Sequence, residues 1–303
     1  MNIISSLFTL LIFPAGLTIL LVGLFYEWMD RKLVARFQYR VGLRWFQPLA
    51  DAAKLFSKEQ IEPPVMTALL FFGLPITAIA GALAAGLYVP MLGLAPSYSF
   101  PGDLVVSLYL LSLMTLSIGL AGWNMTSRFS LVGATRTLTQ LCAYEAPFLL
   151  ALLGPALAAG SWQISEVNAY ASQHWMILTQ PVGFVVALIG LMGKLELPPF
   201  DAPEAETEIV AGALTEYSGR GLAFFNLGKS VELIIGLTLV SSFYLGGLTS
   251  LPLFLIKTIA LLGLMALLQS LLARLRIDQT VGLWWRYGAL LGLVQIGFMI
   301  AWR

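Results

Sequence analysis

The chain has 303 residues, of which 58% are hydrophobic and only 11% are charged. Soluble domains carry about 25% charged residues, so this composition excludes a soluble globular protein and a disordered one. The net charge of +1 gives no reason to expect nucleic acid as a partner. The single cysteine and single histidine exclude a disulfide framework, and they leave no ligand set for an iron–sulfur, haem or zinc site. We therefore expect no metal and no cofactor in this chain.

Long apolar runs, bounded by charge clusters and by Pro or Gly, predict about eight transmembrane helices. The first run lacks a basic leader and a small-residue cleavage motif, so we expect it to remain as a span. The fold class expected is an all-α polytopic membrane protein, with residues 1–303 forming a single transmembrane helical domain. The predicted spans are residues 4–28, 66–90, 103–123, 138–160, 177–197, 223–246, 251–273 and 283–302.

Basic residues are sorted between the connections that join these spans. The first, third, fifth and seventh connections hold nearly all Lys and Arg, whereas residues 91–100, 161–175 and 246–250 hold none. The positive-inside rule then places both termini outside and the charged connections on the cytoplasmic side of the cell's inner (cytoplasmic) membrane. The two largest polar segments, residues 30–65 and 196–222, form the expected docking and coupling surface.

The segment after the first span predicts a short amphipathic helix that begins near Pro48. Leu49, Ala52, Ala53 and Phe56 fall on one helical face, which suits a helix lying in the membrane interface. The alternative is a surface helix that only caps the bundle.

Ionisable residues in or near a span are costly and mark a path for ions or protons. Four acids stand out for this reason, namely Glu27, Glu145, Glu196 and Glu232. Glu145 lies early in the fourth span beside Pro147, which cannot donate a hydrogen bond to the carbonyl of Ala143. A carboxyl group in that setting can hold a proton, as a relay requires. The polar residues Arg136, Gln140 and Tyr144 follow at intervals of four and predict a stripe leading inward. The alternative is a buried Glu that serves packing specificity.

The fifth connection carries five acids without an intervening Lys or Arg, namely Asp201, Glu204, Glu206, Glu208 and Glu216. Prolines and the apolar run 209–211 frame them, so we expect a folded, partly buried acidic funnel rather than a solvated loop. Next in the chain, Lys229 and Glu232 lie one turn apart, and a simple ion pair can explain both. The alternative is that Glu232 belongs to a path for ions or protons.

Several ordered motifs resemble subunit 1 of respiratory complex I (NADH dehydrogenase subunit 1) and its counterparts in membrane-bound nickel–iron hydrogenases. The motifs are Asp30-Arg-Lys-Leu-Val-Ala-Arg36, Pro199-Phe-Asp, Pro203-Glu-Ala-Glu206, Glu216-Tyr-Ser-Gly219 and Ala273-Arg-Leu-Arg-Ile-Asp-Gln279. The resemblance implies a non-catalytic core membrane subunit of an energy-converting oxidoreductase in an electron-transport chain. Such a subunit anchors iron–sulfur and large hydrogenase-like subunits on the cytoplasmic side and contacts antiporter-like membrane subunits and lipid. It couples redox chemistry to proton or sodium translocation.

The same resemblance assigns roles to residues of this chain. No residue is catalytic and none binds a metal. The implied coupling carboxylates are Asp30, Glu145, Asp201, Glu204, Glu206, Glu208 and Glu216. The supporting polar and cationic groups are Arg31, Arg36, Arg40, Arg136, Gln140, Tyr144, Arg274, Arg276 and Asp278.

The family has two branches, and the motifs divide between them. The short segment Arg40-Val-Gly-Leu-Arg-Trp-Phe-Gln47 is similar to the hydrogenases and a related sulfane reductase, whose partner subunits carry iron–sulfur clusters and, in the hydrogenases, a nickel–iron centre. Ala121-Gly-Trp123, Ala143-Tyr-Glu145 and Glu208-Ile-Val-Ala-Gly212 are closer to the quinone-reducing enzymes. The leading hypothesis is the hydrogenase-like branch; the alternative is subunit 1 of a quinone-reducing complex I that helps to form the quinone site. A stand-alone secondary ion transporter and a purely structural anchor are the remaining alternatives.

Overall fold

The computed structural model describes residues 8, 11–63 and 66–301, and every regular element within them is a helix. Six helical segments are long and apolar enough to cross a membrane, and α9 (Pro181–Lys194) is a shorter apolar helix. The predicted all-α polytopic membrane fold is confirmed. The six segments are α4 (Ala68–Gly86), α5 (Asp103–Trp123), α6 (Arg128–Ala159), α11 (Gly219–Tyr244), α12 (Leu251–Leu271) and the continuous run of α13 (Ile277–Leu283), the π-helical turn η2 (Trp284–Gly288) and α14 (Ala289–Ala301).

The largest differences in bounds between the predicted spans and the structure concern two helices. Helix α6 begins at Arg128 instead of residue 138, because the Ser127 hydroxyl caps it by accepting from the Phe129 N–H at 3.3 Å. The first long helix, α2, spans Gly16–Phe37 instead of residues 4–28. Residues 1–7 and 9–10 of that predicted span lie outside the described part of the chain. The predicted spans were cut at clusters of charged residues, but both helices continue through such residues, because an α-helix can include charged side chains without ending.

The amphipathic helix expected after the first span is present as α3 (Gln47–Ser57), with Pro48 in its first turn. Hydropathy did not predict α7 (Ile164–Gln173), which is too short and too polar to read as a span. The predicted span 177–197 is divided in the structure into α8 (Met176–Thr179) and α9. Between α9 and α11, the acidic loop (residues 195–218) contains α10 (Glu206–Ile209) and a 3-10 turn, η1 (Gly212–Leu214).

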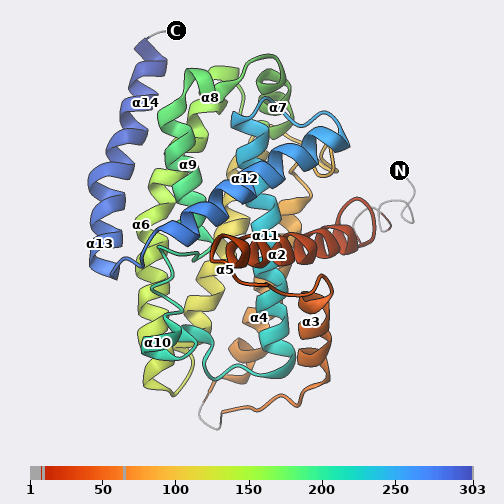
Figure 1. Ribbon diagram of the computed structural model, residues 1–303, viewed down its shortest axis with the longest axis vertical. Helices are drawn as coiled ribbons and strands as arrows, with labels where there is room; N and C mark the ends of the chain where they lie inside the picture. Colours follow the sequence, from red (N-terminus) through yellow and green to blue (C-terminus); the bar gives the residue numbers. More distant parts are fainter. Residues whose placement is uncertain (1–7, 9–10, 64–65, 302–303) are drawn as a thin grey trace.

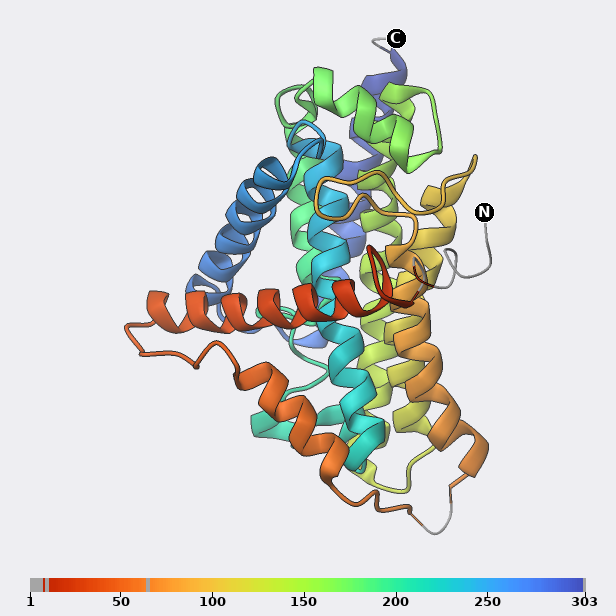
Figure 2. The same cartoon turned by 90° about the vertical axis from the view of Figure 1, so that its right-hand side faces the viewer.

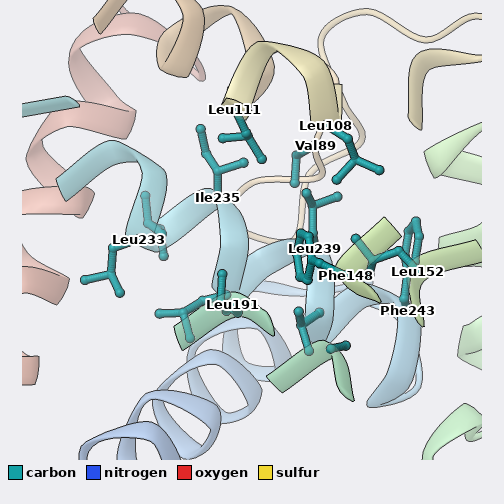
Figure 3. Packing of buried hydrophobic residues seen from close by; sticks show 14 of the residues in the cluster. Val89, Leu108, Leu111, Phe148, Leu152, Leu191, Leu233, Ile235, Leu239 and Phe243 are labelled. Carbon is teal, nitrogen blue, oxygen red and sulfur yellow. The ribbon is translucent and has the colours of Figure 1, made fainter. Parts of the chain in front are cut away.

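Helix α11 is the central element, and it packs against α2, α4, α5, α9 and α12 (Figure 1). Its apolar side chains, including Leu233, Ile235, Leu239 and Phe243, interlock with those of neighbouring helices (Figure 3). Helix α2 lies across the bundle in both views (Figures 1 and 2). The crossing is close: a Cβ added at Gly23 would lie 2.7 Å from the backbone oxygen of Ser230 on α11. Small residues therefore let the two backbones meet.

The connections without basic residues lie in the upper part of the bundle in Figure 2, whereas those with basic residues lie between its middle and its lower end. At one end, the Leu248 N–H donates to Asn168 at 2.8 Å, and the Ile164 N–H donates to Asp103 at 2.7 Å. At the other end, the Ile61 N–H donates to the Ser218 hydroxyl at 3.0 Å. Long-range contacts thus join connections that the distribution of basic residues had assigned to the same side of a membrane.

Candidate functional site

A cavity of about 250 Å³ lies where α2, α11 and the C-terminal end of α9 meet the acidic loop. Helix α5 adds Thr115 to its wall. The charged groups of the wall are five carboxylates and three cations: Glu27, Asp30, Glu196, Glu204, Glu232, Arg31, Lys194 and Lys229. Because buried charges require partners, the arrangement of these groups decides what the cavity can do.

The acidic loop is folded onto the bundle by its own apolar residues. Phe200, Ile209 and Tyr217 are buried, and Phe200 packs on the indole of Trp284 with ring centroids 5.4 Å apart. From α6, the side-chain amide of Gln140 donates to the backbone oxygens of Gly193 at 2.9 Å and of Phe200 at 2.8 Å. The loop is therefore held against α6 and α9, and its acids are fixed relative to the cavity.

Inside the cavity, two lysines each bridge between elements. Lys229 on α11 donates to Glu196 at 2.9 Å and also contacts Glu204 of the acidic loop. Lys194 at the end of α9 pairs with Glu232 on α11 at 3.3 Å, and its ammonium lies 5.6 Å from the ring centre of Tyr144. The expected pair of Lys229 with Glu232 is therefore not the one formed. Lys229 and Glu232 each reach towards the end of α9 and the residues that follow it, because the buried Lys194 and Glu196 there require partners of opposite charge.

The two carboxylates at Lys229 lie in different electrostatic surroundings. Burial raises the pKa of Glu196, and the ammonium of Lys229 partly offsets that rise. The ammonium of Lys229 lowers the pKa of Glu204, more than burial raises it. Glu196 thus holds a proton more readily than Glu204, although the same cation serves both groups.

The other acids of the fifth connection are held at the rim of the site. Asp201 accepts two hydrogen bonds from Arg274, at 2.8 and 2.7 Å. Glu208 pairs with Arg136 at 2.9 Å and lies 3.7 Å from Arg274. The side chain of Glu206 lies outside the described part of the chain. These ion pairs tie the acidic loop to α6 and to the segment before α13.

Glu216 is placed as an anchor. Its carboxylate accepts from the backbone N–H groups of Thr126 at 3.0 Å and Ser127 at 3.2 Å, and from the Thr126 hydroxyl at 3.1 Å. It therefore joins the acidic loop to the turn that starts α6, away from the residues that line the cavity.

The predicted residues of α2 divide between cavity and surface. Asp30 is buried and accepts from the amide of Gln269 at 3.0 Å. Arg31 pairs with Glu27 one turn earlier. Arg36 and Arg40 lie exposed at the end of α2 and beyond it. Elsewhere, Arg276 is exposed and lies 3.4 Å from Asp278.

A second acidic position lies deeper along α6. Glu145 is half-buried and accepts from the Ser112 hydroxyl of α5 at 2.6 Å. The adjacent Tyr144 is buried and shares a hydrogen bond with Thr115 at 3.2 Å. Because Thr115 also lines the cavity, Tyr144 and Thr115 lie between the cavity and the region of Glu145.

Four cavity residues were missing from the site predicted by motif: Glu27, Lys194, Glu196 and, as a cavity residue, Glu232. Glu27, Glu196 and Glu232 carried a signal, since each is an acid in or beside an apolar run. Lys194 carried the same kind of signal, as a lone cation within the predicted span 177–197. Their convergence could not be seen from the sequence, because they lie on α2, at the end of α9, in the acidic loop and on α11.

The fold and the site define a polytopic membrane protein with a charged cavity beneath a folded surface loop. The chain belongs to the NADH dehydrogenase family, whose model matches residues 9–300. It is 30% identical to the H subunit of the NADH-quinone oxidoreductase of Carboxydothermus hydrogenoformans, over 94% of this chain and 86% of that protein. For the corresponding protein of Thermomicrobium roseum the identity is 31%, over 91% of each chain.

The fold is also similar to a chain in the structure of the membrane-bound sulfane sulfur reductase, an archaeal respiratory membrane complex. The TM-score is 0.85 at 22% sequence identity, and the match covers 98% of each chain. The family resemblance predicted from the motifs is confirmed by the family model, and the fold is shared with this chain of the reductase over 98% of each.

Proposed function

We propose that this chain is the core membrane subunit of a complex I-like oxidoreductase, where it couples electron transfer in docked peripheral subunits to proton or sodium translocation. One observation carries the proposal: charged groups continue from the rim, through Glu204, Lys229 and Glu196, to Lys194 and Glu232 within the bundle. Such a series can respond to a redox event at the surface by changing the proton occupancy of buried acids.

The test replaces single acids in the intact complex, in native membranes. Glu232→Gln and Glu145→Gln should abolish ion uptake while electron transfer through the peripheral subunits continues. Glu166→Gln, on exposed α7 at the other end of the bundle, is the matched control and should leave both rates unchanged. Normal ion uptake in both cavity-side variants would refute the coupling role, and a purely structural anchor would then explain the chain better.

A quinone is the electron acceptor that the relatives favour, since they are named as H subunits of NADH-quinone oxidoreductases. The hydrogenase-like branch, which the motifs had favoured, rests on the short segment 40–47 and on the motifs at residues 30–36 and 216–220. Both require iron–sulfur clusters in partner subunits, and the hydrogenase-like branch adds a nickel–iron centre there. The purified complex separates them: quinone-dependent oxidation of its electron donor supports the first, whereas hydrogen or sulfide production with no quinone activity supports the second.

The neighbourhood of Glu145 favours a second membrane subunit beside α5 and α6. Exposing a carboxylate within a span to lipid is energetically costly, and Ser112 donates a hydrogen bond to only one oxygen of Glu145. A partner helix with a hydroxyl or cationic side chain would complete its coordination. Cys142, exposed one turn before Glu145, is a built-in probe. A thiol cross-linker should join it to another membrane subunit, the Cys142→Ser variant should give no product, and a free chain would favour the stand-alone transporter.

A further inference from the structure

Lys229 is a fork between one buried carboxylate and one surface carboxylate. The side chain of Glu196 is 5% exposed, whereas that of Glu204 is 47% exposed. The two acids come from different parts of the acidic loop: Glu196 lies at its start, next to the end of α9, and Glu204 lies further along the loop. Lys229 therefore joins a surface group, which a docked partner can reach, to an acid that solvent barely reaches.

The second oxygen of Glu196 has no hydrogen-bond partner among the described residues. Lys229 is thus the donor on which this buried carboxylate depends in the described structure. While Glu204 also contacts the ammonium, the attraction of Lys229 is divided between two negative groups. Moving Glu204 away would leave the cation to Glu196, and bringing it back would divide the attraction again.

We propose that Lys229 is a positioning residue through which the placement of Glu204 in the acidic loop controls whether buried Glu196 holds or releases a proton. The inference deepens the proposed function by naming the element that connects the docking surface to the interior. When Glu204 is withdrawn from Lys229, the carboxyl proton of Glu196 passes to water in the cavity and the ammonium pairs with the carboxylate left behind. When Glu204 returns, Glu196 takes a proton up again.

The other charged groups that face this fork are fixed by partners of their own. Helix α9 contributes Lys194, which Glu232 of α11 neutralises. Helix α2 contributes Asp30 and the pair of Glu27 with Arg31, and α6 contributes the phenol of Tyr144. In the acidic loop, Asp201 lies near Glu204 and is held by Arg274. Arg274 also contacts two carboxylates of the acidic loop, but their side chains are 21% (Asp201) and 51% (Glu208) exposed. Lys229 instead joins an acid that is 5% exposed to one that is 47% exposed.

The test measures the protonation of Glu196 by infrared difference spectroscopy of the purified complex as the pH is varied. The carbonyl band of protonated Glu196 is identified by its loss in Glu196→Gln. Neutralising the loop acid with Glu204→Gln should move the midpoint of this band down by about one pH unit, a tenfold change in proton affinity. Lys229→Gln should move the midpoint up, and Lys229→Arg, which keeps the cation, should leave it close to that of the wild type.

Glu208→Gln is the matched control, because Glu208 is a loop acid of similar exposure (51%) whose partners are Arg136 and Arg274. Its midpoint should stay at the wild-type value. An unmoved midpoint in Glu204→Gln, or an equal shift in Glu208→Gln, would overturn the inference even if Glu232→Gln abolishes ion uptake. If the midpoint moves as expected while the Glu232 and Glu145 variants pump normally, Lys229 keeps its role and the coupling function fails.

Discussion

The attachment of the acidic loop to α6 depends on a glycine, and Gly133→Ala tests it. A Cβ at this position would lie 2.3 Å from the backbone nitrogen of Ala213 and 2.4 Å from the backbone carbon of Gly212. Ordinary contact begins near 3.4 Å, so the loop backbone would have to move by about 1 Å. It has little room, because Gly212 itself has φ +55° and approaches the oxygen of Pro203. Overpacking of this kind destabilises by about 1–3 kcal/mol.

Two measurements on the purified complex test the effect of Gly133→Ala: its Tm in thermal unfolding, and its ion uptake per electron transferred. We expect a lower Tm and weaker coupling, since Glu204 would shift relative to Lys229. Gly73→Ala on α4 is the control, because a Cβ there meets no atom within 4 Å. Equal stability and coupling in the two variants would show that the loop does not rest on α6 as described.

Three further predictions concern single side chains. Glu216→Gln removes the negative charge that accepts hydrogen bonds from the Thr126 and Ser127 N–H groups, so it should destabilise the complex by about 1–2 kcal/mol in thermal unfolding. Ion uptake per electron should stay normal, and a loss of coupling would instead make Glu216 a relay. Because Lys229 lowers the pKa of Glu204, the stabilisation that Glu204 provides should be complete above the usual glutamate pKa of about 4.3 and be lost as the pH falls through its lower folded-state pKa. The Tm difference between wild type and Glu204→Gln should therefore shrink in acid, and a difference that grows would contradict this sign. Lys257→Met leaves the oxygens of Gly246 and Gly247 without their donor and should cost about 1–2 kcal/mol, which Lys257→Arg should largely restore.

The residues that line the cavity show why part of the site could be predicted. Glu204 lies in a dense acidic segment and Asp30 in an ordered motif, so both stood out in the sequence. Glu145 stood out because a carboxyl group within an apolar run requires a reason. Glu216 stood out because it belongs to the same acidic segment as Glu204. The three hydrogen bonds that its carboxylate accepts show instead that it anchors the acidic loop. The sequence thus identifies which charged residues are unusual, but the groups that each one contacts in the structure determine its role.

The pairing of the lysines shows what sequence spacing left open. Lys229 and Glu232 are three residues apart, and that spacing alone favours an ion pair within one helix. Both residues lie near the end of α9, where other partners are within reach: Lys229 pairs with Glu196, and Glu232 pairs with Lys194. The spacing within one helix did not decide the pairing, because side chains from several elements converge on the same small cavity.

The amino-acid sequence by itself determined that this protein is helical, crosses a membrane several times and belongs to a complex I-like family, because apolar run length and ordered motifs are properties of the chain alone. Its division of basic residues also determined which connections gather at the same end. Only the tertiary structure decided that α2 lies across α11, that the acidic loop folds onto α6, and that Lys229 serves two carboxylates. Those features arise from close packing and from the need to pair buried charge, and both depend on residues far apart in the sequence.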